Sequence, residues 1–447
     1  MTAAPAPLAR HLGLGSALAL VIGEVLGVGI FLTPANMARS LGSPFWLLVV
    51  WLVMGLMAFS GALCYGELAA RFPEAGGGYV YLREAYGRAA AFLYGWKCLL
   101  VLDPGLTAAL GVGVASYLTY ATGLSPDGSR VVAMLTIAAI AAVNVRGVRY
   151  GAGVLRGFTA LKLGLLATLI LWGFVFRLGD WSHFVPFIPQ RAGSAPLPAA
   201  LAGGMVAAFF SFGGWWDAAK LAGEVRDPAR TLPRALGLGV AVVTLVYILT
   251  SAAFLYLVPL EGVASGEAFA GQAGQVLFGG AGGRVFAGIV VVCVVSSMAG
   301  FMMAAPRVYY AMGRDRVFPA AMAALHPSYG TPYRAILLQA ALAILLMLLG
   351  TFSQIVAYFI FITVVFVALT VAAVFVLRRR AAPGGGYRTP GYPLTPLVFL
   401  ALVAVLLFLL ASQNPVQAGL GVLVVGLGWP VYRMIFRHER TEERSGS

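Results

Sequence analysis

Six ionisable residues stand inside apolar stretches of this sequence, where a charge is costly and a functional role is the default interpretation: Glu24, Lys97, Asp103, Lys162, Asp217 and Lys220. We expect Lys97 and Lys220 near the ends of their helices, where a long stem can carry its ammonium group to water. Lys162 lies deeper in its apolar run and needs a partner inside the membrane. Glu24 and Asp103 could each bind a proton, pair with Lys97 or Lys162, or attract a cationic substrate, and the sequence leaves these options open.

Glycines interrupt two of the apolar stretches near their middles, with Gly27-Val28-Gly29 in the first and Gly213-Gly214 in the second. A helix broken in lipid frees backbone groups that are costly unless protein, water or a ligand satisfies them. The N-terminus of the second half presents free N–H groups and the positive end of the helix dipole, which suits a carboxylate. A glycine seam for close helix packing is the structural alternative.

Composition excludes several classes of protein. The chain has 447 residues, of which 60% are hydrophobic and 10% charged, with a mean hydropathy of +0.90, unlike any soluble domain. Lysine and arginine lie in short connections rather than on a basic face with interleaved aromatics, so the net charge of +14 does not indicate a nucleic-acid partner. The cysteines and histidines show no metal-ligand spacing, and we expect neither a metal nor another cofactor. A membrane-embedded enzyme would need clustered polar residues, and those found here are scattered.

We predict twelve membrane-spanning helices, because apolar runs of about 20 residues recur and each can cross a hydrocarbon core of about 30 Å. They span residues 12–36, 44–68, 89–121, 129–147, 154–177, 198–222, 235–258, 284–312, 333–350, 353–377, 394–412 and 416–436. Most arginines fall on one side, so the positive-inside rule places both termini in the cytoplasm, on the inner face of the cell membrane. The connection at 67–87 is expected to be a surface loop with a short amphipathic helix, or else a gate against the bundle.

The interrupted helices are the first and the sixth, so they enter the membrane with opposite polarity. Interruptions at matching places of two inverted halves indicate a midplane binding site in a secondary transporter. We therefore predict an all-α polytopic membrane protein built from two inverted five-helix repeats. Its expected parts are a cytoplasmic N-terminus at 1–11, repeats at 12–177 and 198–377, two further helices at 394–436 and a cytoplasmic tail at 437–447.

Several motifs occur together along the first ten predicted helices: GVGIFLTP at 27–34, ELAARFPEAGGGYVYLREAYG at 67–87, FTALKLGLL around Lys162, FSFGGW followed by GEVRDPARTLP up to residue 233, and RVYYAMGRDRVFP at 307–319. In combination they resemble the amino acid–polyamine–organocation superfamily of transporters, and within it the L-type branch and its bacterial serine/threonine-exchanger-like members. The resemblance implies the LeuT-type inverted-repeat fold, amino acid transport without sodium, and a substrate held between the unwound parts of helices 1 and 6.

The resemblance also implies a substrate site. The family's GxGIF motif matches Gly27, Val28, Gly29, Ile30 and Phe31, so backbone N–H groups near Val28 and Gly29 would receive the substrate's carboxylate. The family more often has serine where Val28 stands, and this chain lacks that hydroxyl.

On helix 6, the motif from Phe210 to Gly214 would receive the α-ammonium group. The carbonyl groups of Phe210, Ser211 and Gly213 are the expected acceptors, because an ammonium group has three donors to satisfy once water is removed. Phe212 would then form an aromatic lid over the site.

Lys162 matches the helix 5 lysine that the family places where sodium-coupled relatives hold a sodium ion. Its ammonium group could bridge helix 1 carbonyls to helix 8 hydroxyls, which Ser296 and Ser297 supply. A lysine paired with an acid for stability alone is the alternative. Asp103 precedes a proline where L-type relatives often carry a different, frequently basic residue, and it departs from the family there.

The leading hypothesis is therefore a sodium-independent transporter of small or medium neutral L-amino acids, working by alternating access as an exchanger or a proton-coupled importer. An amino-acid sensor that binds without transport is one alternative, and a transporter of cationic amino acids or polyamines using Asp103 is another. The expected partners are the amino acid, membrane lipid and, for a homodimer rather than a monomer, a second copy of the chain.

Overall fold

The computed structural model describes residues 8–27, 29–260, 269–349, 352–380, 386–413 and 415–435, and it is dominated by helices. They are α1 (Leu14–Val25), α2 (Gly29–Leu41), α3 (Pro44–Arg71), α4 (Gly78–Tyr86), α5 (Arg88–Lys97), η1 (Cys98–Leu102), α6 (Asp103–Thr122), α7 (Pro126–Val145), α8 (Val148–Val175), η2 (Trp181–Phe184), α9 (Leu197–Phe212), η3 (Trp215–Glu224), α10 (Pro228–Leu257), α11 (Phe269–Phe278), η5 (Gly279–Ala281), α12 (Gly282–Ala304), α13 (Pro306–Arg314), η6 (Ala320–Ala323), α14 (Tyr333–Leu349), α15 (Phe352–Arg380), α16 (Leu394–Gln413) and α17 (Pro415–Ile435).

The predicted class, an all-α polytopic membrane protein, is confirmed. Among the described residues, ten helices are long and apolar enough to cross a membrane, and the bent pair α1 and α2 would make an eleventh span. The predicted span at 333–350 corresponds to α14, which is apolar but shorter than the others. The count of twelve and the inverted repeat stay predictions.

Two proline residues explain where the observed helices differ from the predicted ones. The predicted span 284–312 comprises α12 and α13, which run on through Ala305 in helical geometry, and α13 begins at Pro306, whose ring offers no backbone donor. The predicted span 89–121 is continuous, but a π-helical turn, η1, precedes Pro104. Such a turn widens the helix by one residue and takes up the clash that the proline ring would make with the preceding turn.

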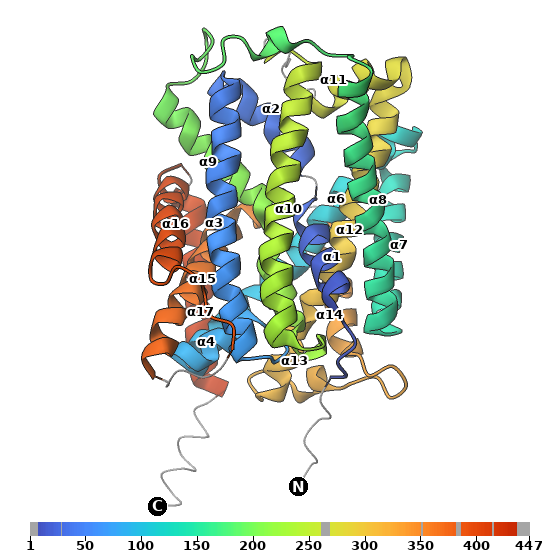
Figure 1. Ribbon diagram of the computed structural model, residues 1–447. Coiled ribbons are helices and arrows are strands. Elements are labelled where there is room, and N and C mark those ends of the chain that lie inside the picture. The colour runs from blue at the N-terminus through green and yellow to red at the C-terminus, as the bar shows by residue number, and fades with distance from the viewer. Residues whose placement is uncertain are drawn as a thin grey trace, which may run out of the picture.

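The interrupted helix α1 lies at the centre of the bundle. It packs against α8, α10 and α12, while α3 and α10 run side by side along the front of the bundle (Figure 1). α2 packs against α9, and α12 against α6. This arrangement brings the two interruptions, one between α1 and α2 and one between α9 and η3, into the same region.

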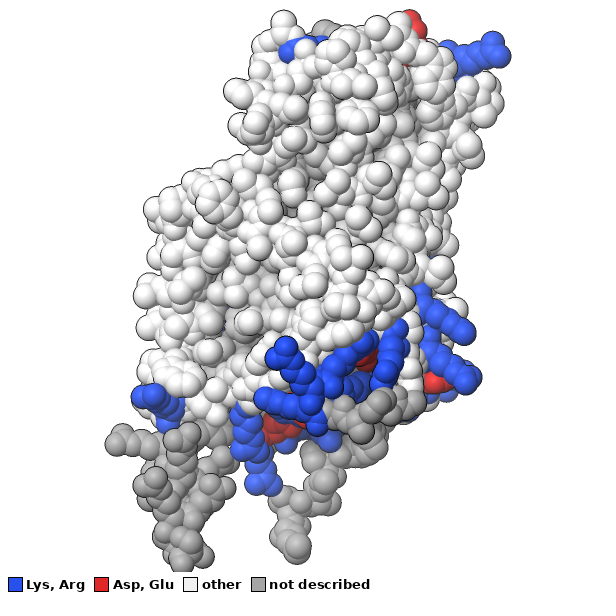
Figure 2. Space-filling model, turned by 60° about the vertical axis from the view of Figure 1, so that its left-hand side comes forward, with Lys and Arg blue, Asp and Glu red and all other residues white. Residues whose placement is uncertain are grey.

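Charged side chains are distributed as a bilayer requires. Lysine and arginine gather at the end of the molecule where α4 and α13 lie, and a broad band with few charges separates this basic end from the opposite one (Figure 2). An uncharged band of this kind is what a hydrocarbon core can surround.

The connection at 67–87 is not a surface loop. It contains α4, whose side chains Tyr79, Val80, Tyr81 and Leu82 are all buried. The expected short helix is present as α4, and the Gly76 backbone N–H donates to the Lys220 carbonyl over 2.9 Å, so the segment contacts η3; its role as a gate stays a prediction.

Candidate substrate site

The first interruption separates α1 from α2, whose axes differ by 46°. A Cβ atom on Gly29 would stand 2.6 Å from the Ser211 hydroxyl and 2.9 Å from its Cα, so only glycine lets α2 approach α9 this closely. Gly27 faces Ser297 in the same way, at 3.3 Å. Val28, the central residue of the predicted carboxylate site, lies outside the described residues, and Ile30 is buried without lining the cavity. The glycines therefore serve packing, and the carboxylate role stays a prediction.

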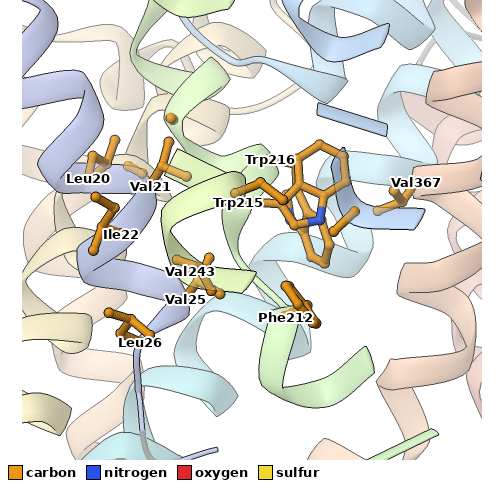
Figure 3. Close-up of a cluster of buried hydrophobic side chains, with 14 of the residues drawn as sticks. Leu20, Val21, Ile22, Val25, Leu26, Phe212, Trp215, Trp216, Val243 and Val367 are labelled. Atoms are coloured by element: carbon orange, nitrogen blue, oxygen red, sulfur yellow. The ribbon is translucent and has the colours of Figure 1, made fainter. Parts of the chain in front are cut away.

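The second interruption is built from Gly213 and Gly214. Gly214 has φ of +108°, a conformation that glycine adopts without strain, and the chain continues in 3₁₀ geometry as η3. A Cβ atom on Gly214 would lie 3.4 Å from the Glu24 Cβ atom and 3.7 Å from its Oε2 atom. The end of α1 and the break after α9 are therefore direct neighbours, and Figure 3 shows the buried apolar side chains around them.

Tyr247 of α10 joins the two interruptions, and none of the sequence motifs contains it. Its hydroxyl lies 2.8 Å from the Val25 carbonyl and 2.5 Å from the Ser211 carbonyl. The only signal in the sequence is a tyrosine within an apolar helix. The Ser211 carbonyl, expected to face the substrate, already accepts a hydrogen bond from this residue.

A cavity of about 140 Å³ lies between the two interruptions. It is lined by Glu24, Val25, Gly27, Gly29, Leu102, Leu106, Leu110, Phe209, Phe210, Ser211, Gly213, Gly214, Trp216, Asp217, Ser297, Phe301, Ile360 and Thr363. Eight of the predicted site residues are thus brought together: Glu24, Gly27, Gly29, Phe210, Ser211, Gly213, Gly214 and Ser297.

Phe212 is not a lid over this cavity. It is 1% exposed and packs against Trp51 and Tyr247, with ring centroids 6.0 and 5.1 Å away. Of the three phenylalanines of α9, Phe209 and Phe210 line the cavity and Phe212 does not. Phe210 is 43% exposed and is the aromatic side chain best placed to cover a ligand.

Lys162 is fully buried and joins three helices. Its Nζ atom donates to the Gly23 carbonyl of α1 over 2.8 Å and to the Ser297 hydroxyl of α12 over 3.2 Å. Ser297 in turn donates to the Gly23 carbonyl over 2.7 Å. The expected bridge from helix 5 to helices 1 and 8 is present through Ser297, whereas the hydroxyl of Ser296 makes no hydrogen bond in the described structure. Whether this ammonium group replaces a sodium ion stays a prediction.

The remaining buried charges form a cluster that the sequence analysis did not foresee. Lys220 lies 2.9 Å from Asp217 and 3.7 Å from Asp103, and the Tyr309 hydroxyl donates to Asp103 over 2.9 Å. The partner of Asp103 is therefore Lys220, not Lys97 or Lys162. Lys220 does not extend to water, because two carboxylates hold it in the interior.

Lys97 is the last residue of α5 but is equally buried, which contradicts the expected extension of its ammonium group to water. Its ammonium group lies 3.3 Å from the Thr363 hydroxyl and 5.0 Å from the centre of the Tyr94 ring. Sequence position alone misplaced both lysines, because it does not show which neighbouring helices cover a side chain.

The basic end of the molecule is closed by a network around Glu224. The backbone N–H groups of His11 and Leu12 donate to the Glu224 carbonyl over 2.8 and 2.9 Å, so the segment before α1 is fixed to the end of η3. The Glu224 carboxylate accepts from Arg307 over 2.7 and 3.2 Å, and both side chains are buried. Nearby, Asp315 accepts from Arg83 and Tyr79 over 2.8 and 2.9 Å.

Comparison with known proteins agrees with this geometry. A family model described as amino acid permease matches residues 12–429. The serine/threonine exchanger SteT of Bacillus subtilis is 31% identical over 429 residues, which cover 95% of this chain and 96% of the exchanger. The human large neutral amino acids transporter small subunit 2 is 29% identical over 441 residues, 95% of this chain and 80% of that protein. Mouse Asc-type amino acid transporter 1 is 29% identical over 436 residues, 95% of this chain and 81% of that protein. The chain belongs to the amino acid permease family and is a multi-pass membrane transporter of amino acids.

Proposed function

We propose that this protein carries small or medium neutral L-amino acids across the cell membrane by alternating access, without sodium, as an exchanger or a proton-coupled importer. One observation supports this most directly: both helix interruptions border a single cavity. The N-terminus of α2 offers backbone donors to a carboxylate there. The relatives named for serine and threonine and for large neutral amino acids support a neutral substrate.

Sodium independence is supported by the position of Lys162. Its ammonium group already braces α1 against α8 and α12 through Gly23 and Ser297. A positive charge that belongs to the chain is always present, so the brace needs no ion from solution.

The direction of the cavity supports an alternating-access cycle. Under the positive-inside rule the basic end faces the cytoplasm, and the Glu224 and Arg307 network seals that end. The cavity wall includes Leu106 and Leu110 of α6. Along the span that begins at Arg88, both leucines come after Asp103. We infer that the cavity opens away from the cytoplasm in this conformation and that release inward requires the seal to separate. Residues 12–177 and 198–377 would be the two inverted repeats, in a monomer or a homodimer of the inner membrane.

A transporter of cationic amino acids or polyamines built around Asp103 has less support. Asp103 does not line the cavity, and Lys220 and Tyr309 already occupy its carboxylate.

Uptake of labelled amino acids into proteoliposomes tests the proposal. We expect uptake of alanine, serine or threonine that is equal in sodium and choline buffers, with arginine and lysine competing poorly. Stimulation by internal amino acid identifies an exchanger, and stimulation by an inward proton gradient identifies an importer. Binding without uptake would contradict transport in favour of a sensor, and uptake that collapses without sodium would refute the role given to Lys162.

A further inference from the structure

Glu24 is a buried acid whose two carboxylate oxygens make no hydrogen bond in the described structure. It lies in the last turns of α1, is 8% exposed and lines the cavity. A buried carboxylate without a partner is costly, so its retention at a ligand site requires an explanation in terms of the ligand.

The other acidic and hydroxyl side chains of the cavity lining are all engaged. The pairs are Ser211 with Thr33 at 2.8 Å, Asp217 with Lys220 at 2.9 Å, Ser297 with Lys162 at 3.2 Å and Thr363 with Lys97 at 3.3 Å. Lys162 and Lys220, the buried lysines of this region, are thus committed to groups other than Glu24. Among these lining residues, Glu24 alone has its full capacity to accept hydrogen bonds.

The surroundings of Glu24 are shaped for its side chain. A Cβ atom on Gly300 of α12 would stand 2.9 Å from the Glu24 Cγ atom, and Gly214 leaves room on the other side. The carboxylate also lies at the C-terminal end of α1, where the helix dipole is negative and favours a cation. The N-terminus of α2, with the opposite polarity, begins across the interruption. The two ends together match a zwitterion.

We propose that Glu24 binds the ammonium group of the substrate and that the site consequently accepts primary amines with small apolar chains as well as neutral amino acids. This inference rests on the proposed function and names the acceptor within that site. The Ser211 and Phe210 carbonyls already accept from Tyr247 at 2.5 Å and from the Gly213 N–H at 3.2 Å. A carboxylate forms a stronger, charge-assisted hydrogen bond to an ammonium group than a carbonyl does. It can therefore hold an amine that lacks the carboxylate which would bind at the N-terminus of α2.

The rest of the cavity lining is apolar and suits a ligand with an apolar side chain. Leu102, Leu106, Leu110, Phe209, Phe301 and Ile360 form most of the remaining wall. The remaining acid of the lining, Asp217, is already ion-paired with Lys220 at 2.9 Å, so a second ammonium group would have to compete with this lysine. The geometry therefore favours a monoamine over a diamine.

The test compares three ligands of one carbon skeleton by thermal shift and by intrinsic tryptophan fluorescence, since Trp216 lines the cavity. They are L-valine, isobutylamine, which lacks the carboxylate, and 3-methylbutanoate, which lacks the amine. With wild-type protein we expect binding in the order valine, isobutylamine, 3-methylbutanoate. Binding of 3-methylbutanoate without binding of isobutylamine would overturn the proposal, and this comparison needs no variant.

Glu24→Gln keeps the shape and removes the charge, while Glu24→Asp keeps the charge on a shorter stem. We expect Glu24→Gln to weaken the binding of valine about 10- to 100-fold and to abolish the binding of isobutylamine. Glu24→Asp should retain part of the affinity for both ligands. If valine binds wild type and Glu24→Gln equally, the proposed function stands and the assignment of Glu24 is wrong. If valine and the other neutral amino acids do not bind the wild type, the proposed function fails and this inference fails with it.

Discussion

Replacing Lys162 by methionine tests whether the buried ammonium group is a brace between moving helices. The change keeps most of the stem volume and removes the hydrogen bonds to the Gly23 carbonyl and the Ser297 hydroxyl. A hydrogen bond from a charged donor contributes about 1.5–3 kcal/mol. The Gly23 carbonyl keeps a second donor, the Ser297 hydroxyl, so we expect this conformation to lose about 3 kcal/mol of stabilisation in total. That loss shifts the balance between this conformation and its alternatives by about 100-fold.

The assay measures the initial rate of uptake and the dissociation constant in the same preparation. Lys162 is absent from the cavity lining, so we expect turnover to fall much more than affinity. Thr159→Val is the matched control, because its hydroxyl also ties α8 to α1, through the Ala19 carbonyl at 3.1 Å, without a charge. We expect about a fivefold effect from that neutral bond. Normal uptake by Lys162→Met, or equal effects of the two variants, would refute the reasoning.

Three further changes probe the closures described above. Gly29→Ala should abolish binding and lower the melting temperature, because its Cβ would stand 2.6 Å from the Ser211 hydroxyl; the control Gly153→Ala, which meets no atom within 4 Å, should do neither. Tyr247→Phe should weaken substrate binding about fivefold in a fluorescence titration, since it removes the hydrogen bonds to the Val25 and Ser211 carbonyls. Unchanged affinity would mean that these two hydrogen bonds are not needed for binding. Arg307→Met leaves the Glu224 charge buried and unpaired, so we expect thermal unfolding to show a loss of stability of about 3–5 kcal/mol. The double variant Arg307→Met/Glu224→Gln should recover stability. A double variant no more stable than the single one would contradict this.

The positions of the helix breaks could be predicted from the sequence because paired glycines in an apolar run are a local signal. The contact between Lys162 and helix 1 could be predicted as well, through the resemblance to a known family. The first signal lies within a single segment of the chain. The second joins three helices, and it could be predicted only because the family resemblance supplied the packing that the local sequence does not show.

The errors concern residues whose role is set by a neighbouring helix. Phe212 lies only two residues after Phe210 but faces Trp51 and Tyr247, and only the packing of α9 decides which aromatic side chain reaches the cavity. Lys220 was assigned to the membrane interface because the approach of Asp103 on α6 is invisible in the sequence around it. Tyr247 was missed for the same reason, since both of its carbonyl partners lie on other helices.

The π-helical turn η1 changes the direction in which the later side chains of its membrane span point. One additional residue in a turn rotates everything after it by about 100° relative to a regular helix. Leu102, Leu106 and Leu110 line the cavity at intervals of four residues in the register that follows this turn, and Lys97, before the turn, bonds to Thr363 on α15. A version of this helix shortened by one residue would have the more regular backbone, yet it would turn its leucine wall away from the ligand. The irregular turn is therefore part of the cavity, although most of its residues do not touch the cavity.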